Sequence, residues 1–388
     1  MKAIKIAENI YWVGAIDWDL RNFHGYLTQR GSSYNAYLII DKKITLIDTV
    51  KPTVKDQMFA RIADIIDPRK IQCIISNHVE MDHSGSLPDI MALTPEATIY
   101  TSPNGEKGLQ AHFMKKWKFA VVKTGDTIST GKYSLHVVNT PMVHWPDNMV
   151  CYMPETKILF SNDSFGQHYA SSALFDEDNP LDIVLDEAKK YYANIVMPYG
   201  KQVQKEYEDL KKFDIGMITP SHGVIWKKHV GDIVTSYLNW VSGKTEKKAL
   251  ITWDTMWKST EKIATEVLWP VFEKTGYQVV MKNLQCNHIS DVITDVLDSA
   301  YVCVGSPTLN NNMLPSVSAF LTYLKGLSPG GKKAIAFGSY GWGGQSIDQV
   351  HNLLIDSKFS IEESIKVKYI PTEDDIKNMK ENLLKKIK

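Results

Sequence analysis

The sequence of 388 residues predicts a two-domain protein, an N-terminal αββα sandwich followed by an α/β doubly wound parallel sheet. Three observations carry this prediction. Short β-branched and aromatic segments mix with helical ones over the first two-thirds of the chain. A short, polar, glycine-containing segment then occupies residues 243–248, and strictly alternating strands and helices follow it. We therefore expect two domains, residues 1–246 and 247–388.

The first domain begins with apolar segments separated by turn residues, which predict a meander of antiparallel strands at residues 9–15, 35–41 and 44–50. Apolar residues at helical spacing then predict a helix over residues 54–67, stopped by Pro68. A bounded, isoleucine-rich run predicts a buried strand at residues 71–75. We expect a further helix at residues 105–117 and further strands at residues 97–102, 119–126, 133–141, 149–154 and 157–164.

The last third of the chain has the alternation typical of a doubly wound sheet. Helices are expected at residues 259–276, 290–299, 314–327 and 347–358. The five strands are expected at residues 248–254, 277–284, 300–306, 332–339 and 364–370. Ligands of such sheets bind beyond the carboxyl ends of the strands.

Composition narrows the classes of function. The 44 basic and 44 acidic residues balance, which argues against nucleic acid or an anionic membrane as a partner. The N-terminus has no signal-peptide pattern and no apolar run is long enough to span a membrane, so we expect a cytoplasmic protein. The four cysteines are far apart without a CxxC pair, which indicates reduced thiols and no Cys₄ iron site. Any one-electron donor must then be another protein.

The most informative stretch follows the strand at residues 71–75. His78, Glu80, Asp82 and His83 lie within six residues, on a loop that leaves a strand end. Such side chains are seldom buried unless they are paired or bind a metal. The alternative is a solvated polar turn.

Three more potential ligands sit at strand-to-loop junctions, namely His144, Asp163 and His222. Each of them taken alone is more often a hydrogen-bonded polar residue than a ligand. Together with the cluster they make seven donors, which suit two metals that share one carboxylate and keep open positions.

The motif HxExDH at residues 78–83, the sequence HWPD at residues 144–147 and the C-terminal flavin-type domain resemble the flavodiiron proteins over nearly the whole chain. The first 245 or so residues resemble the metallo-β-lactamase fold, whose hydrolases have HxHxDH, with Glu80 here replacing the second histidine. A more anionic site with open positions favours iron. The resemblance also matches Asp48 to an acid that would orient a ligand imidazole.

The resemblance implies a specific ligand set. One iron would be held by His78, Glu80 and His144. The other would be held by Asp82, His83 and His222, and Asp163 would bridge the two. His24, His168 and Tyr192 would lie near the site as proton donors or polar contacts, with a structural role as the alternative for each.

Three loops at the expected strand ends, residues 255–260, 306–311 and 339–344, resemble those of flavodoxin and imply bound FMN. Hydroxyls would bind the phosphate, while aromatic rings and glycines would allow a flat ring to approach. Core packing is the alternative for Trp257 and Trp342. No GxGxxG follows the first strand, which disfavours a nicotinamide dinucleotide. The implied FMN residues are Thr255, Met256, Trp257, Ser259, Thr260, Pro307, Thr308, Asn310, Asn311, Tyr340, Gly341, Trp342, Gly343 and Gly344.

The resemblance implies an oxidoreductase that reduces dioxygen to water, nitric oxide to nitrous oxide, or both, with electrons passing through FMN to the two irons. Its donor would be rubredoxin, a reduced deazaflavin or a separate reductase. It also implies a head-to-tail homodimer, or a dimer of dimers, that brings the flavin of one chain beside the irons of another.

Two other functions stay open from the sequence. One is a dizinc hydrolase of the lactamase or glyoxalase kind with an appended flavodoxin module, in which a metal-bound hydroxide attacks an ester or amide. The other is an electron-transfer flavoprotein whose metal site has decayed. Glu80 argues against the first, and the presence of all seven ligands argues against the second.

Overall fold

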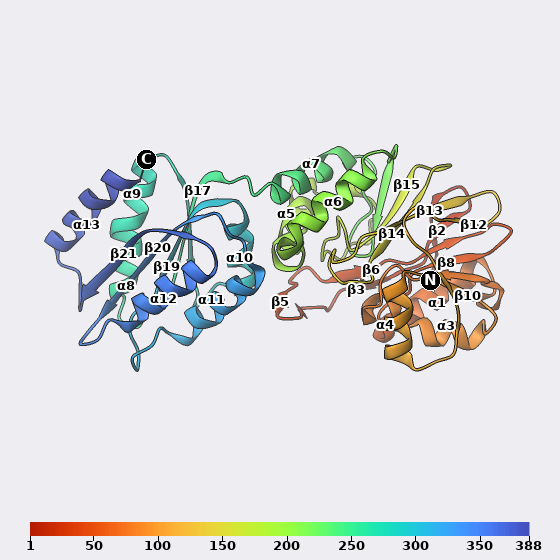
Figure 1. Cartoon of the computed structure of the whole chain (residues 1–388), viewed down its shortest axis with the longest axis horizontal. Coiled ribbons are helices and arrows are strands. Elements are labelled where there is room, and N and C mark those ends of the chain that lie inside the picture. The colour runs from red at the N-terminus through yellow and green to blue at the C-terminus, as the bar shows by residue number, and fades with distance from the viewer. Residues whose placement is uncertain (388) are drawn as a thin grey trace. The chain divides into compact units, whose positions relative to one another are not determined.

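The structure is a computed structural model, which describes residues 1–387. The chain divides into two compact units (Figure 1). Unit 1 comprises Met1–Tyr192 and Tyr199–Leu238, and unit 2 comprises Ala193–Pro198 and the chain from Asn239 onward. The predicted fold class is confirmed by the sheets of the two units, whereas the domain boundary after residue 246 stays a prediction. Within residues 1–387, no helix combines the length and the apolar character needed to cross a bilayer.

The first sheet of unit 1 has seven strands. The first four strands in spatial order form three antiparallel pairs, as expected for the predicted meander. The remaining three pairs are parallel. In spatial order the strands are β1 (Ile4–Ala7), β2 (Ile10–Trp12), β7 (Tyr37–Ile39), β8 (Thr45–Ile47), β9 (Cys73–Ile75), β10 (Thr98–Thr101) and β11 (Lys118–Val121).

The second sheet of unit 1 has five strands, and only its last pair is parallel. These are β12 (Thr127–Ser129), β13 (Ser134–Asn139), β14 (Met149–Met153), β15 (Ile158–Asn162) and β16 (Met217–Pro220). Two small antiparallel ribbons complete the strands of the unit, β3 (Ala15–Asp17) with β6 (Ser32–Tyr34), and β4 (Asn22–Phe23) with β5 (Tyr26–Leu27).

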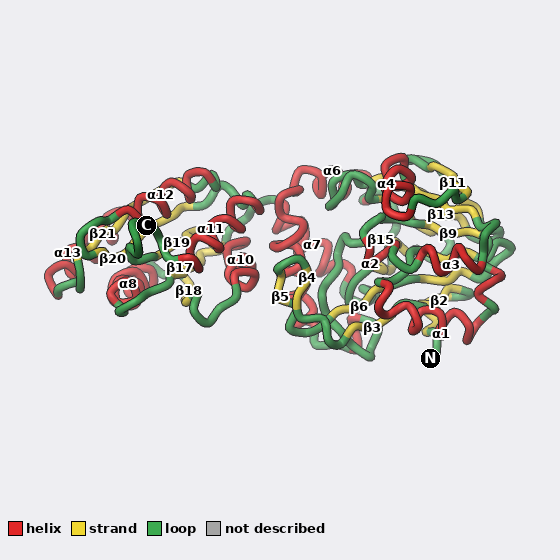
Figure 2. The backbone as a smooth tube through the Cα atoms, turned by 90° about the horizontal axis from the view of Figure 1, so that it is seen from below, coloured by secondary structure: helices red, strands yellow, loops and turns green. Residues whose placement is uncertain are grey.

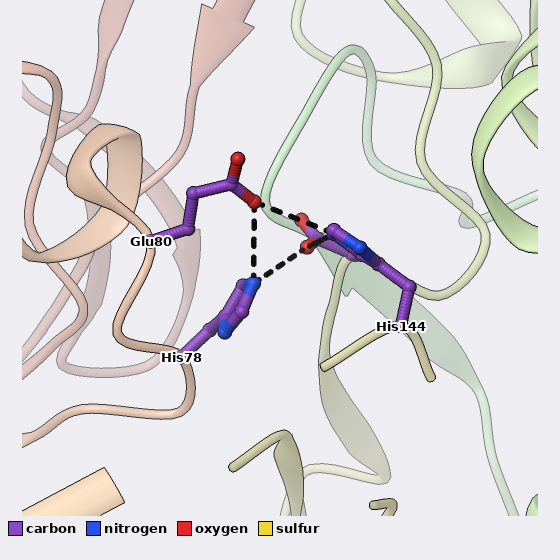
Figure 3. A group of neighbouring side chains, drawn as sticks. His78, Glu80 and His144 are labelled. Atoms are coloured by element: carbon purple, nitrogen blue, oxygen red, sulfur yellow. Dashed lines mark ion pairs between the residues drawn. The ribbon is translucent and has the colours of Figure 1, made fainter. Parts of the chain in front are cut away.

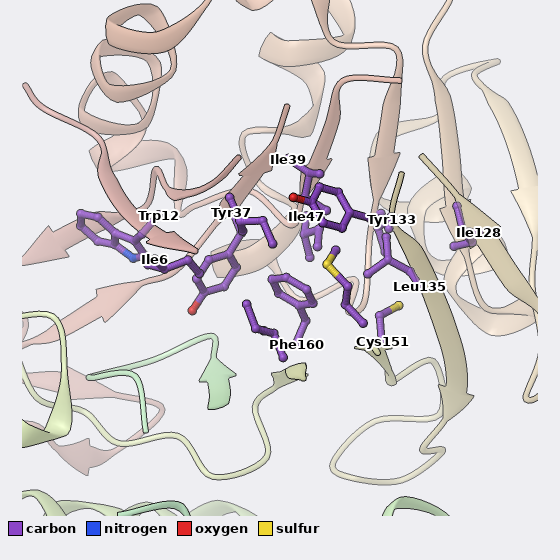
Figure 4. Packing of buried hydrophobic residues seen from close by; sticks show 14 of the residues in the cluster. Ile6, Trp12, Tyr37, Ile39, Ile47, Ile128, Tyr133, Leu135, Cys151 and Phe160 are labelled. Atoms are coloured by element: carbon purple, nitrogen blue, oxygen red, sulfur yellow. The ribbon is translucent and has the colours of Figure 1, made fainter. Parts of the chain in front are cut away.

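Apolar side chains from both sheets meet in one buried core (Figure 4). Trp12, Tyr37 and Ile47 of the first sheet pack with Leu135 and Phe160 of the second, and each of these five is at most 2% exposed. Alternate residues of a strand point to one face, so apolar residues at every second position can be buried between two sheets. This core holds the strand ends of the two sheets in fixed positions.

Helices cover the sheets of unit 1. A second apolar cluster joins the outer face of the first sheet to residues of α1, α3 and α4. Beside the second sheet lie α5, α6 and α7 (Figures 1 and 2). The helices are α1 (Lys55–Ile65), α2 (Met81–Ser84), α3 (Leu87–Leu93), α4 (Pro103–Phe113), α5 (Leu181–Tyr191), α6 (Gly200–Leu210) and α7 (Val230–Val241).

Unit 2 contains one five-stranded parallel sheet in the order β18–β17–β19–β20–β21. Counted along the chain this order is 2-1-3-4-5, the flavodoxin-type order of doubly wound sheets. The strands are β17 (Glu246–Trp253), β18 (Gln278–Asn283), β19 (Ser299–Gly305), β20 (Lys333–Tyr340) and β21 (Ser360–Lys368). Its helices are α8 (Ser259–Ile263), α9 (Trp269–Lys274), α10 (Ile289–Asp298), α11 (Pro315–Leu327), α12 (Gln345–Asp356) and α13 (Glu373–Lys386).

The expected linker at residues 243–248 is wrong at its end, because residues 246–248 are the first residues of β17. Lys248, which the sequence analysis placed in both the linker and the first strand, is buried, and its Nζ lies 2.7 Å from Asp295 Oδ1 and 2.9 Å from Asp298 Oδ1. A lysine that finds two carboxylates can be buried in a strand, although composition alone assigns it to a polar loop.

Glu206 of α6 is a buried carboxyl group with a single hydrogen-bond donor. Ser164 Oγ, in the turn after β15, lies 2.9 and 3.0 Å from its two oxygens. Burial disfavours the ionised form and raises the pKa of Glu206 from 4.5 to about 8. The folded protein therefore holds a neutral acid here at pH 7.

We predict that Glu206 makes the free energy of unfolding fall as pH rises. Below the unfolded pKa the carboxyl is protonated in both states, so its contribution to stability is complete there. Between about pH 4.5 and 8 only the unfolded chain releases the proton, and stability is lost as pH rises through the folded pKa. Urea unfolding at pH 5, 6.5 and 8.5 would show wild type losing stability relative to Glu206→Gln.

The matched control is Glu208→Gln on the same helix, because Glu208 is exposed and forms an ion pair with Lys211. The difference in free energy of unfolding between Glu208→Gln and wild type should be the same at pH 5, 6.5 and 8.5. A pH-independent difference for Glu206→Gln as well would mean that the Glu206 carboxyl is ionised in the folded state, contrary to the prediction.

Candidate functional site

Unit 1 brings the seven predicted ligands together from separate strand ends. His78 follows β9, Asp163 follows β15 directly, and His222 follows β16 by two residues. Because β15 and β16 are parallel neighbours, their carboxyl ends lie at the same edge of the second sheet. His144 comes from the loop between β13 and β14, and α2 carries Asp82 and His83.

Four of these side chains form the first group of potential ligands, His78, Glu80, His144 and Asp163, whose ligand atoms lie within 4.8 Å of one another. Glu80 Oε2 lies 3.3 Å from His78 Nε2 and 3.4 Å from His144 Nε2 (Figure 3). Asp163 Oδ2 lies 3.6 and 3.2 Å from the same two nitrogens. Two imidazole nitrogens and two carboxylate oxygens thus face one point.

The second group consists of Asp82, His83 and His222. Its two imidazoles approach the carboxylate of Asp82, with His83 Nε2 at 3.3 Å and His222 Nε2 at 3.3 Å. The same nitrogens lie 3.1 and 3.5 Å from Asp163 Oδ1. Asp163 therefore directs one oxygen to each group, which is the geometry of a carboxylate shared by two cations.

Several polar atoms at this point have no hydrogen-bond partner within the described chain. They include His78 Nε2 and both carboxylate oxygens of Asp82 and of Asp163, all buried. A buried polar atom without a partner costs several kcal/mol, on the order of 2–7. Metal ions would satisfy all of these atoms at once, so the residues fit a pair of cations.

The electrostatics of the cluster also favour cations. Burial alone would raise the pKa of Asp163, but the charge of His83 and the close imidazole of His144 hold this pKa well below its usual range. Burial disfavours a charged His78, yet the hydrogen bond to Asp147 and the nearby carboxylate of Glu80 outweigh this and raise the pKa of His78 to about 10. The carboxylates thus attract positive charge strongly, and a metal ion takes the place of the protons when it binds.

Asp147 is a functional residue that the sequence analysis did not select. Its Oδ2 accepts hydrogen bonds from His78 Nδ1 at 2.9 Å and from the backbone N–H of Val79 at 2.8 Å. With Nδ1 donating, Nε2 of His78 is free to bind a metal. The available signal was HWPD itself, where an acid follows His144 by three residues.

Asp48 was expected to orient a ligand imidazole, but in the structure it forms hydrogen bonds with Asn77. Its carboxylate accepts hydrogen bonds from the backbone N–H of Asn77 at 2.7 Å and from Asn77 Nδ2 at 2.9 Å. Asp48 therefore holds the residue before His78. The imidazole of His222 is oriented instead by the backbone carbonyl of Ser33, which accepts from Nδ1 at 2.9 Å.

The three predicted catalytic residues occupy different surroundings. His24, on the β4–β5 ribbon, places Nε2 2.8 Å from Glu80 Oε1, and this hydrogen bond raises its pKa. His168 is fully buried beside His222, with ring centroids 4.9 Å apart, and its Nε2 has no partner within the described chain. Burial lowers the pKa of His168 well below its usual value.

Tyr192 packs against Tyr237, with ring centroids 5.2 Å apart. The tyrosine whose ring lies near both His168 and His222 is its neighbour Tyr191, at 5.2 and 5.9 Å. The sequence alone could not show which of Tyr191 and Tyr192 faces the site, because that depends on the orientation of α5. The catalytic role of Tyr192 stays a prediction.

Unit 2 contains a cavity of about 780 Å³ at the carboxyl ends of its strands. The strand order reverses between β17 and β19, which is where a ligand of such a sheet is expected. Twelve of the fourteen predicted residues line the cavity, namely Thr255, Met256, Trp257, Ser259, Pro307, Thr308, Asn310, Asn311, Tyr340, Gly341, Trp342 and Gly343.

The two predicted residues that do not line it are Thr260 and Gly344. Thr260 is buried, with Oγ1 3.4 Å from Ser339 Oγ, and Gly344 is the residue before α12. The sequence analysis missed Tyr369 and Ile370, which also line the cavity. They directly follow β21, which ends at Lys368, whereas the sequence analysis placed both residues inside the fifth strand, at residues 364–370.

The cavity has features suited to a phosphorylated flat ring. Thr255 lines the cavity, and its Oγ1 is buried without a hydrogen-bond partner within the described chain. Trp257 and Trp342 are 89% and 92% exposed, so their predicted alternative, burial in the core, is wrong. Exposed aromatic rings at the rim of a cavity are available for stacking.

Comparisons with known proteins identify relatives of this chain. A family model described as ODP family beta lactamase matches residues 33–223. The nitric oxide reductase of Moorella thermoacetica is 42% identical over 380 residues, which cover 96% of this chain and 95% of that protein. 

Two solved structures match the whole chain. The rubredoxin oxygen:oxidoreductase of Desulfovibrio gigas has a TM-score of 0.97 at 39% identity, covering 100% of this chain and 98% of that one. The flavodiiron protein of Giardia intestinalis has a TM-score of 0.96 at 34% identity, covering 100% and 96%. The chain therefore belongs to the flavodiiron protein family.

Proposed function

We propose that this oxidoreductase reduces dioxygen to water, nitric oxide to nitrous oxide, or both, at a pair of non-haem irons that receive electrons through FMN. The observation that carries the proposal is the carboxylate of Asp163, whose two oxygens face two different pairs of imidazole nitrogens. The names of the relatives, nitric oxide reductase and rubredoxin oxygen:oxidoreductase, support both substrates.

We assign one iron to His78, Glu80 and His144, and the other to Asp82, His83 and His222, with Asp163 as the bridge. Glu80 supports iron over zinc, because a carboxylate in place of an imidazole makes the site harder and more anionic. When bound, the irons would supply redox change and open positions for a diatomic molecule, and FMN would accept reducing equivalents and release single electrons.

The side chains around the centre would manage protons. Reduction of dioxygen to water consumes four protons, and reduction of two nitric oxide molecules to nitrous oxide and water consumes two. We propose His24 as a proton donor, because its Nε2 already hydrogen-bonds Glu80 and its ring is open to solvent. His168 Nε2 is a candidate polar contact because it is buried without a partner, and Tyr192 is kept as a third candidate.

We assign the FMN site to the cavity of unit 2, and the iron and FMN domains to residues 1–246 and 247–388. The unpartnered hydroxyl of Thr255 supports a phosphate in the first loop, and the exposed indole of Trp342 supports a ring near the fourth strand. Rubredoxin, a reduced deazaflavin or a separate reductase is the proposed donor. A head-to-tail homodimer stays a prediction from the family.

The dizinc hydrolase is not favoured as an alternative. Its nitrogen-rich motif is interrupted by Glu80, and the cavity in unit 2 would serve no purpose in hydrolysis. The relatives that match the whole chain are named as oxidoreductases.

The proposal predicts the content and reactivity of the purified protein. Metal and flavin analysis should give two irons and one FMN per chain. In anaerobic stopped-flow, the chemically reduced protein should be reoxidised by dioxygen, by nitric oxide or by both, and the faster gas is the preferred substrate. Zinc in place of iron, with thioester hydrolysis and no reoxidation by either gas, would establish the hydrolase instead.

A second prediction concerns Asp147. The substitution Asp147→Ala removes the acceptor of His78 Nδ1 and of the Val79 N–H, so the imidazole loses its fixed orientation. Loss of such a partner weakens metal binding by roughly 10- to 100-fold, which a chelator competition assay for iron would measure. FMN content should not change.

The control for Asp147→Ala is Asp126→Ala in the same unit, because Asp126 also accepts a backbone hydrogen bond, from Lys123 N at 2.9 Å, in a turn without metal ligands. It should keep wild-type iron affinity. If Asp147→Ala keeps both irons as tightly as this control, Asp147 does not orient a ligand.

A further inference from the structure

Asp254 is a buried carboxylate at the entrance to the first loop of the FMN cavity. It follows the last residue of β17 and precedes Thr255, and it is 8% exposed. Its backbone N–H donates to the carbonyl of Gly305, at the end of β19, at 3.1 Å. Asp254 therefore lies between the two strands where the sheet order reverses.

The two carboxylate oxygens of Asp254 contact three different segments. Oδ1 accepts from the backbone N–H of Thr255 at 2.6 Å and from Gln285 Nε2 at 2.7 Å. Oδ2 accepts from the hydroxyl of Ser316, in the first turn of α11. No lysine or arginine forms an ion pair with Asp254 within residues 1–387, so neutral donors alone hold this carboxylate.

These contacts fix the conformation of Thr255. Its N–H donates to Asp254, and its carbonyl accepts from Gln285 Nε2 at 2.8 Å. With both backbone groups engaged, the buried hydroxyl is the one polar group of Thr255 without a partner in the described structure, and Thr255 is among the residues that line the cavity. The backbone contacts thus leave Oγ1 for a ligand.

The contact with Ser316 joins the first loop to the second. The chain from Pro307 to Asn311 lines the cavity and leads into α11, whose first residues are Pro315 and Ser316. A hydrogen bond at the start of α11 therefore fixes where this second loop ends relative to Thr255. The carboxylate of Asp254 therefore connects the first and second loops, which both line the cavity.

We propose that Asp254 is a positioning residue that presents the Thr255 hydroxyl to the phosphate monoester of the flavin and holds the second loop at the matching distance. This inference rests on the proposed FMN site. Asp254 acts through hydrogen-bond geometry and not through its charge. In Asp254→Asn the amide oxygen can still accept from Thr255 and Gln285, and the amide nitrogen can donate to the Ser316 hydroxyl.

The test compares FMN with riboflavin, which lacks the phosphate. The full chain, stripped of flavin, is titrated with each and followed by quenching of flavin fluorescence. Asp254→Ala should weaken FMN binding by about tenfold, or about 1.4 kcal/mol, and riboflavin binding by less than about threefold. Asp254→Asn should restore FMN affinity to within about threefold of wild type.

Two further variants keep the test decisive. Gln285→Ala should also weaken FMN more than riboflavin, and because Gln285 is exposed its removal leaves the fold intact even if Asp254→Ala does not fold. Lys325→Ala, which breaks an exposed ion pair with Asp356 in the same unit, should change neither affinity.

Equal losses of FMN and riboflavin binding in Asp254→Ala and Gln285→Ala, or no loss of FMN binding in either, would overturn the positioning role and leave the FMN site intact. Failure of Asp254→Asn to restore binding would show that the charge acts, and would overturn the role of geometry. A wild-type chain that binds neither flavin would refute the proposed FMN site, and the inference with it.

Discussion

The carboxylate of Asp163 is the constraint on which unit 1 depends. It lies buried between four imidazole nitrogens and is accompanied by two more acidic ligands, Glu80 and Asp82. Polar groups of this kind do not stay buried without compensation, so the loops that carry them can converge only where cations neutralise them. Binding of the proposed metal ions would therefore be coupled to the final packing of these loops.

The sandwich makes this convergence possible. The ligand loops leave strands of both sheets, and the apolar core between the sheets fixes where those strands end. Acidic side chains outside the cluster then refine the positions, Asp147 through the imidazole of His78 and Asp48 through Asn77. In unit 2, Asp254 likewise accepts hydrogen bonds from the backbone of Thr255, which lines the cavity, and from Ser316. Carboxylates that hold backbone N–H groups are thus a recurring means by which this chain orients its functional loops.

Strands such as β9 and β19 were predictable because strands buried on both faces have short continuous apolar runs bounded by turn residues. The start of β17 at Glu246, two residues before the predicted strand, was not predicted. The burial of Lys248 depends on Asp295 and Asp298, which are distant in sequence. For the sites, ligand-type residues after apolar runs were enough to find the metal cluster. Asp147 and Tyr191 were missed because their importance comes from contacts between loops, or from the face of a helix, which spacing does not encode. Tyr369 was missed because the end of the fifth strand was expected two residues too late.

Two iron ions, one on either side of Asp163, are the central prediction. Anomalous X-ray diffraction from crystals of the iron-loaded protein tests their presence directly. Data collected on both sides of the iron absorption edge should show two peaks, one beside His78, Glu80 and His144 and the other beside Asp82, His83 and His222. A single peak, or scattering that appears only above the zinc edge, would contradict it.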